Sequence, residues 1–252
     1  MTELTRQELE ARAAAGDVDA MIGLGSLCFK QGGEERDKAL RWYDAAADAG
    51  SKAGALYAGL ALDSLAKDAD SRGEGAEAAR LWTGALERLG RSLPDAKGGT
   101  SFEKLSRDAL GRTRYFASAS LLLYNRDFKT AFSCARGLSG ADARVNVLLS
   151  LFMLDRGLFP AGDRAAAFDR FMRAVNDGDY IRGGALSKAR GVEQRAAATA
   201  ARSFALLLIS GKLDASDDNA MLAQTLLRLV FGALSDERAK NALLKRFPTL
   251  AK

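Results

Sequence analysis

The stretch that decides the fold is residues 14–50, AAGDVDAMIGLGSLCFKQGGEERDKALRWYDAAADAG, which reads as two short amphipathic helices with a glycine near each end. The spacing of its small residues recurs further along the chain. The matching positions are Gly16, Ala20 and Gly25 in the first copy and Gly50, Gly54 and Gly59 in the second. Trp42 precedes Gly50 by eight residues, and Trp82 precedes Gly90 by the same interval. A helical hairpin that recurs in this way predicts a stacked array of repeats.

The composition is that of a folded, mostly helical protein. Hydrophobic residues make up 48% of the 252 residues and charged residues 27%, and only three prolines interrupt possible helices. Residues 1–100 carry 13 basic and 17 acidic side chains, whereas residues 101–252 carry 24 and 15. The basic second half could therefore meet an acidic partner, a nucleic acid or a membrane surface. Its basic residues are also scattered enough to form an ordinary solvated surface.

The chain shows no feature of secretion or membrane insertion. Its N-terminal segment is charged and lacks the apolar core of a signal peptide. The longest apolar runs, Val145–Leu154 and Phe204–Ile209, are shorter than the roughly 20 residues of a transmembrane helix. Cys28 and Cys134 lie far apart in apolar segments, which favours buried thiols in a reducing compartment. We therefore expect a cytoplasmic protein without a membrane span. A leader sequence that has been removed from the natural chain is kept as an alternative.

Polar and glycine residues mark the expected ends of the first helices. Thr5–Glu8 has the spacing of a capping box, in which hydroxyl and carboxylate satisfy free backbone N–H groups. Asp17 is expected to start the first helix of the hairpin, and Gly32 to end it. Asp37 is expected to cap the return helix, which Gly50 closes.

The first hairpin also carries a wider pattern of small and aromatic residues. Its members are Gly16, Ala20, Leu24, Gly25, Phe29, Gly32, Gly33, Asp37, Lys38, Ala39, Trp42, Tyr43, Ala46, Ala47 and Gly50. With these residues the hairpin resembles a Sel1-like repeat, a relative of the tetratricopeptide repeat. The resemblance implies an all-α, right-handed α-solenoid of about five or six antiparallel helical hairpins. Independently of it, Gly25 can let two helices approach closely, while Phe29, Trp42 and Tyr43 fill the space between hairpins.

The resemblance continues, less completely, over residues 50–90 and 141–178. The structural repeat positions found there are Gly59, Trp82, Gly90, Phe171 and Gly178. In the second unit the turn between the helices is expected to stretch over Lys67–Gly75. In the later unit Phe171 stands where Tyr43 stands in the first.

The chain is expected to have three parts. Residues 1–91 form N-terminal Sel1-like repeats, residues 92–101 a loop or hinge, and residues 102–252 degenerate repeats with C-terminal capping helices. Periodicity predicts helices over residues 102–124, 128–136, 143–155, 192–208 and 217–234, with a last short helix before Pro248. Pro94 and two glycines mark the loop as the clearest break in the pattern.

The residues that most enzymes use are missing. The chain has no histidine, which removes Ser-His-Asp and Cys-His catalysis and imidazole zinc sites. It has no Walker phosphate loop, and Gly23-x-Gly25 lacks the third glycine and the preceding strand of a dinucleotide fingerprint. The pairs Asp68/Asp70 and Asp217/Asp218 suit helix ends better than a catalytic pocket. We expect no enzymatic activity, no metal and no cofactor.

The most basic stretch of the chain is residues 180–202. Its basic residues are Arg182, Lys188, Arg190, Arg195 and Arg202. On one helix face they could contact a phosphate backbone or another acidic surface. Apart from Tyr180 the stretch offers no aromatic ring for base stacking, so electrostatic binding is kept as an alternative function.

A stacked repeat array presents a concave surface lined by the first helix of each hairpin. Aligning the first two units places three pairs of residues in equivalent positions on those helices. These candidates for protein binding are Gly23, Ser26, Lys30, Tyr57, Leu60 and Ser64, which could instead face solvent or a neighbouring helix. We predict a non-enzymatic adaptor or scaffold that binds a protein or peptide there. Because some bacterial proteins with similar repeats are regulators, immunity proteins or secretion accessories, binding to one cognate protein is the second expectation.

Overall fold

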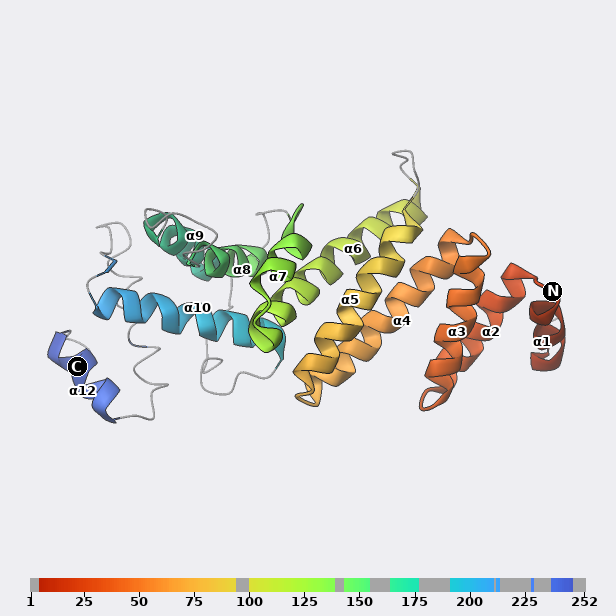
Figure 1. The fold of residues 1–252 in the computed structure, drawn as a ribbon, viewed down its shortest axis with the longest axis horizontal. Helices are drawn as coiled ribbons and strands as arrows, with labels where there is room; N and C mark the ends of the chain where they lie inside the picture. Colours follow the sequence, from red (N-terminus) through yellow and green to blue (C-terminus); the bar gives the residue numbers. More distant parts are fainter. Residues whose placement is uncertain are drawn as a thin grey trace. The chain divides into compact units, whose positions relative to one another are not determined.

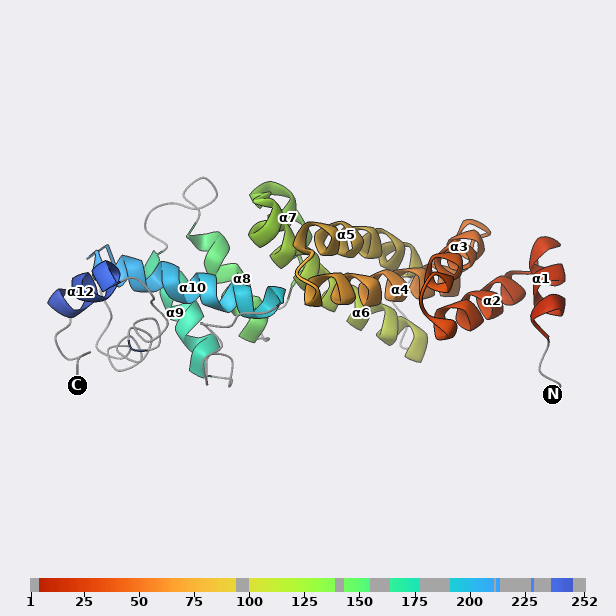
Figure 2. The same ribbon diagram turned by 90° about the horizontal axis from the view of Figure 1, so that it is seen from below.

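The computed structural model is all-helical over the part of the chain that it describes, with no strand in that part. The described residues are 5–93, 100–138, 143–154, 164–176, 191–210, 212–213, 228 and 237–246. The chain divides into two compact units, residues 1–125 and 126–252, whose helices are drawn in Figures 1 and 2. The expected all-α class is confirmed. Within the described ranges, no helix is both long and apolar enough to cross a membrane.

The first unit is a series of helices in which each packs against the next along the chain (Figure 1). Its elements are α1 (Arg6–Ala14), α2 (Val18–Gln31), α3 (Glu35–Asp48), α4 (Lys52–Ser71), α5 (Gly75–Ser92), α6 (Ser101–Ser120) and the π-helical turn η1 (Leu121–Asn125). In addition, α2 contacts α4, and α4 contacts α6. The α2–α3 and α4–α5 hairpins correspond to the two copies of the repeated pattern.

Several helix ends lie where their sequences place them. Thr5 and Glu8 form the capping box of α1. Asp17 is the N-cap of α2 and accepts the backbone N–H of Ala20 at 3.1 Å. Gly50, between α3 and α4, has a φ of 91°, a left-handed conformation that glycine adopts without strain.

Two expected boundaries are wrong. Asp37 does not cap α3, which begins two residues earlier with Glu34 at the N-cap position. Gly32 and Gly33, which precede this helix, have φ values of 73° and 55° and reverse the chain within two residues. The hairpin therefore does not need a linker that extends to Asp37. The turn expected over Lys67–Gly75 is also much shorter, because α4 continues to Ser71 and Gly73, with a φ of 81°, completes the reversal.

The second hairpin ends differently from the first. Gly90 lies inside α5, which continues to Ser92, and a Cβ on Gly90 would have no atom within 4 Å. The helix expected up to Tyr124 ends as α6 followed by η1. The Tyr124 hydroxyl donates to Asp70 Oδ1 at 2.6 Å, and a Cβ on Gly75 would lie 2.5 Å from the Tyr124 ring. Tyr124 therefore packs η1 onto the turn between α4 and α5.

Two groups of buried side chains hold the hairpins of the first unit together. The group shared by α2, α3 and α4 consists of Cys28, Ala39, Tyr43, Ala58 and Ala61. The group shared by α4, α5 and α6 consists of Leu56, Leu89, Ala109 and Leu110. Glycines allow the closest approaches, since a Cβ on Gly25 would lie 2.5 Å from the Tyr43 ring and one on Gly54 2.7 Å from the Ala47 backbone nitrogen.

A buried carboxylate joins the second hairpin to α6. Asp63 of α4 is 3% exposed and accepts the Trp82 indole N–H at 3.1 Å. The Lys67 ammonium lies 2.7 Å from the same carboxylate, and the Arg112 guanidinium of α6 lies 3.7 Å away. Trp82 is fully buried and stacks on Phe116 of α6, with 5.0 Å between ring centroids. These partners compensate the cost of burying the charge.

The second unit is also helical in its described residues. They are α7 (Phe128–Ala135), α8 (Ala143–Met153), α9 (Arg164–Asn176), α10 (Val192–Ile209) and α12 (Glu237–Arg246). Phe171 is fully buried and stacks on Phe204 of α10 at 5.0 Å. Three expectations fall on residues outside the described ones: Gly178, residues 94–99 of the expected hinge, and the helix expected over residues 217–234, of which only Arg228 is described, as helical. Both cysteines are free thiols, with Cys28 buried and Cys134 half-buried.

Candidate functional site

The candidate site is a groove of about 410 Å³ between α3 and α5, here called the α3–α5 groove, with part of its lining supplied by α4. Its apolar lining consists of Leu40, Leu62, Leu65 and Leu81. Its charged lining consists of Arg36, Asp37, Asp68, Arg72, Glu77, Arg80 and Arg88. The leucines are buried or half-buried, so the groove has an apolar floor beneath a charged rim.

The lining residues recur at helical spacing. Leu62 and Leu65 are followed by Asp68 and Arg72, so α4 turns one side of its length toward the groove. On α5 the corresponding side includes Gly84, where a Cβ would meet Arg88 Nη1 and Leu62 Cδ1 at 3.6 Å. The missing side chain at residue 84 keeps the groove open, and any side chain larger than alanine would enter it.

Ion pairs hold α3 and α5 together beside the groove. The Arg88 guanidinium of α5 donates twice to the Asp44 carboxylate of α3, with both nitrogen–oxygen distances 3.2 Å. One turn further along, Arg91 donates to Asp48 at 2.8 Å. The hydrogen bonds that Arg88 donates to Asp44 raise the pKa of Arg88. The two pairs fix the spacing of the helices at the end of the groove that lies toward their C-termini.

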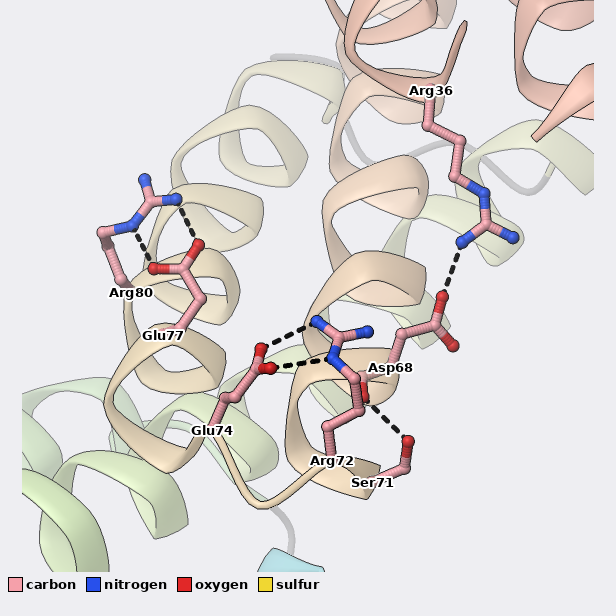
Figure 3. Close-up of polar contacts among 7 residues, drawn as sticks. All are labelled: Arg36, Asp68, Ser71, Arg72, Glu74, Glu77 and Arg80. Atoms are coloured by element: carbon pink, nitrogen blue, oxygen red, sulfur yellow. Dashed lines mark hydrogen bonds and ion pairs between the residues drawn. The ribbon is translucent and has the colours of Figure 1, made fainter. Parts of the chain in front are cut away.

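The opposite end of the groove carries three further arginine–carboxylate contacts (Figure 3). Arg36 of α3 donates from Nη1 to Asp68 of α4 at 2.5 Å. Arg72 and Glu74 pair through two hydrogen bonds of 2.9 and 2.7 Å across the α4–α5 turn. A similar pair joins Arg80 to Glu77 within α5 at 2.8 and 2.5 Å. Each guanidinium therefore has an orientation set by a neighbouring carboxylate.

These contacts keep the rim ionised at neutral pH. Hydrogen bonds from Arg80 lower the pKa of Glu77, and hydrogen bonds from Arg72 lower the pKa of Glu74. Both carboxylates are thus charged and occupied by their own arginines. The Arg36 guanidinium also lies over the Phe29 ring, 5.5 Å from its centroid, which holds it against the protein surface.

The six predicted protein-binding residues lie on α2 and α4, outside the lining of the α3–α5 groove. Gly23 faces α1, because a Cβ there would lie 3.4 Å from Leu9. Ser26 and Tyr57 come together through Tyr43, which donates to Ser26 at 3.2 Å and stacks on Tyr57 at 5.6 Å. Of the remaining three residues, Lys30 is exposed and Ser64 is half-buried. Leu60 is half-buried and packs in the core shared by α4, α5 and α6. No polar contact between described residues joins these three to Ser26 or Tyr57.

The predicted basic surface is described only in part. Arg182, Lys188 and Arg190 lie outside the described residues. Arg195 and Arg202 are both exposed on α10, one below the other at a separation of two helical turns. The alternative of electrostatic binding therefore stays a prediction.

The sequence held a signal for the α3–α5 groove that the search along the first helices missed. Arg80, Gly84 and Arg88 recur every four residues and must share one face of a helix. Arg36 and Leu40 have the same spacing in the preceding second helix. What the spacing could not give was that these two faces border one hollow, which depends on how the hairpins pack.

The groove is lined by leucines, glycines, arginines and carboxylates. Across the described residues, no three acidic, cysteine or histidine side chains gather as a metal site. Comparisons with protein-family models, with curated proteins and with solved structures found no match for this chain.

Proposed function

We propose that this chain is a non-enzymatic adaptor or scaffold that binds a protein or peptide in the α3–α5 groove. The observation that carries the proposal is an apolar floor of four leucines bordered by arginines that are already oriented by neighbouring carboxylates. Recognition surfaces combine an apolar pocket that anchors a side chain with a few fixed polar groups that orient the ligand. The groove meets both requirements.

The proposal includes a Sel1-like, tetratricopeptide-like architecture. On this proposal the chain is a right-handed α-solenoid of about five or six hairpins that acts on one cognate protein in the cytoplasm. Two hairpins with the same glycine spacing, and contacts of α2 with α4 and of α4 with α6, support it. The groove then lies between the second helices of adjacent hairpins, and the residues first predicted to bind lie on the first helices.

The test is a selection of binders from a displayed library of random peptides on the full chain. Binding of each selected peptide is then measured on two variants. Gly84→Trp places a large side chain in the groove, and Ser64→Trp places the same side chain on the predicted concave surface of α4. Because Gly84 has room for a Cβ and both positions are partly exposed, both variants are expected to fold.

Selected peptides should bind wild type and Ser64→Trp alike and should lose binding to Gly84→Trp. Loss on Ser64→Trp alone would move the site to the first helices and overturn the assignment to the groove. A library that yields no binder would overturn the peptide-binding function itself. Far-UV circular dichroism checks that each variant keeps the helical content of the wild type.

A further inference from the structure

Three arginines at the rim of the α3–α5 groove keep N–H groups that no described residue accepts. A guanidinium carries five N–H donors, and a carboxylate accepts through two oxygens. Arg80 uses Nε and Nη2 on Glu77, and no described residue accepts from its Nη1. Arg72 likewise donates from Nε and Nη2 to Glu74, and no described residue accepts from its Nη1. Each oxygen of Glu77 and of Glu74 already accepts one hydrogen bond from its own arginine.

Arg36 has the largest surplus of the rim arginines. Its single hydrogen bond to another described residue runs from Nη1 to Asp68. Its Nε is buried and lacks an acceptor within the described part of the chain. A buried N–H without an acceptor costs free energy until a partner supplies one. An arriving carboxylate could instead accept from Nη2 of Arg36, for which no described residue is an acceptor, while Asp68 keeps its place on Nη1.

The floor adds a requirement for one apolar side chain. Leu62 and Leu65 of α4 lie between the walls that carry Arg36 and Arg80. The lining contains no aromatic ring, and a nucleic acid would need one to stack its bases. A polypeptide with an apolar residue between acidic ones matches both the floor and the rim.

From the proposed function and these free arginine N–H groups, we infer that the α3–α5 groove binds an acidic peptide segment of a partner protein. One apolar side chain rests on the leucine floor, and flanking carboxylates bind the free N–H groups of Arg36 and Arg80. The existing ion pairs persist and hold the guanidiniums in place, which lowers the entropy lost on binding.

Asp37 opposes this ligand and provides a second test. It lines the groove and is exposed, and its carboxylate makes no hydrogen bond or ion pair with another described residue. Its negative charge must repel the carboxylates that Arg36 attracts. Removing that charge is expected to strengthen binding, whereas a merely structural role for the rim predicts no change.

The probe is a short fluorescein-labelled peptide with one central leucine flanked by aspartates and glutamates, titrated with the full chain and followed by fluorescence anisotropy. Arg80→Glu should weaken binding about tenfold, since it replaces a charge-assisted contact by repulsion. The matched control Arg41→Glu changes the same charge on an exposed position of α3 outside the groove and should alter binding less than about twofold. Asp37→Asn should strengthen binding about twofold.

Comparison peptides separate this inference from the proposed function. Replacing the central leucine by serine, or the acidic residues by their amides, should weaken binding. Tighter binding of a lysine-flanked peptide that Gly84→Trp abolishes would overturn the acidic ligand and leave the groove as a peptide site. Displacement of the acidic probe by an oligo-dT strand at lower concentration than by unlabelled peptide would favour nucleic acid and overturn the inference. Equal effects of Arg80→Glu and Arg41→Glu would do the same.

Discussion

The α2–α3 and α4–α5 hairpins follow the same pattern of small residues and tryptophan, yet they bury different aromatic side chains. In the first, Tyr43 is buried and Trp42 is half-buried. In the second, Trp82 is fully buried, and Thr83, the counterpart of Tyr43, is half-buried. The repeat pattern therefore determines where helices approach each other, and the side chain that fills the contact depends on its neighbours.

A single exchange of residue type accompanies this difference. Counted from the shared glycines Gly25 and Gly59, Asp63 occupies the position that Phe29 holds in the first hairpin. A carboxylate buried there needs hydrogen-bond donors, and the Trp82 indole is one that can be buried with it. Phe29 needs no such donor, and Trp42 of the first hairpin stays at the edge of its core.

The largest expected effect separates the two tryptophans. Trp82→Ala should lower the free energy of unfolding by about 3–5 kcal/mol, because it empties a fully buried site and removes the indole donor of Asp63 Oδ1. Trp42→Ala should cost no more than about half as much, since that ring is half-buried. These are the two tryptophans of the chain, and both lie in the first unit. Each variant can therefore be followed in urea by the fluorescence of the other tryptophan.

Trp82→Phe is the control for volume, because it keeps an aromatic ring and removes the indole N–H. Its cost should lie between wild type and Trp82→Ala. Equal destabilisation by Trp42→Ala and Trp82→Ala would show that the two hairpins use their tryptophans alike, against the difference in burial.

Glycine substitutions test whether equivalent pattern positions have equivalent roles. Gly54→Ala should destabilise the fold by about 1–3 kcal/mol, because its Cβ would lie 2.7 Å from the backbone of α3, which cannot move aside as a side chain can. Gly90→Ala should stabilise it by about 0.5–1 kcal/mol, since the site is helical and open. Both values come from urea titrations. Destabilisation by Gly90→Ala would restore Gly90 as a hairpin-closing residue.

The sequence was sufficient for features that depend on local chemistry. Helical periodicity and the caps at Thr5 and Asp17 predicted helices whose class and first boundaries the structure confirms. The predicted α4–α5 turn was too long. The polar residues that were interpreted as part of this loop form the last helical turns of α4, which continues to Ser71. Propensity alone cannot decide such cases, since packing of Tyr124 against Gly75 helps to place this turn.

The candidate site was less accessible to sequence reasoning than the fold. Its lining combines α3, α4 and α5, and includes Gly84, where a Cβ would contact Arg88 and Leu62. Spacing identifies residues that share a helix face, but a groove between helices depends on long-range packing. The predicted residues on α2 and α4 instead include Ser26 and Tyr57, which are linked through Tyr43.

The smallest expected effect again separates the hairpins, through the caps that start their first helices. Asp17 caps α2 with a carboxylate, whereas Ser51 caps α4 with a hydroxyl that does not titrate. The backbone N–H of Ala20 and the guanidinium of Arg12 lower the pKa of Asp17 below its ordinary value of 3.8. A carboxylate whose pKa is lower in the folded state stabilises the fold above its unfolded pKa, and this contribution is lost as the pH falls through the folded value.

Asp17→Ser should therefore match wild type closely in melting temperature at neutral pH and lose less of it on acidification below about pH 5. Ser51→Asp should do the reverse and add acid sensitivity to the second hairpin. Circular dichroism melts at a series of pH values measure both slopes. The other carboxylates titrate in all three proteins, so the differences between the curves isolate the caps. Parallel curves would mean that the Asp17 carboxylate contributes nothing as an ion, and that both hairpins start on caps of equivalent chemistry.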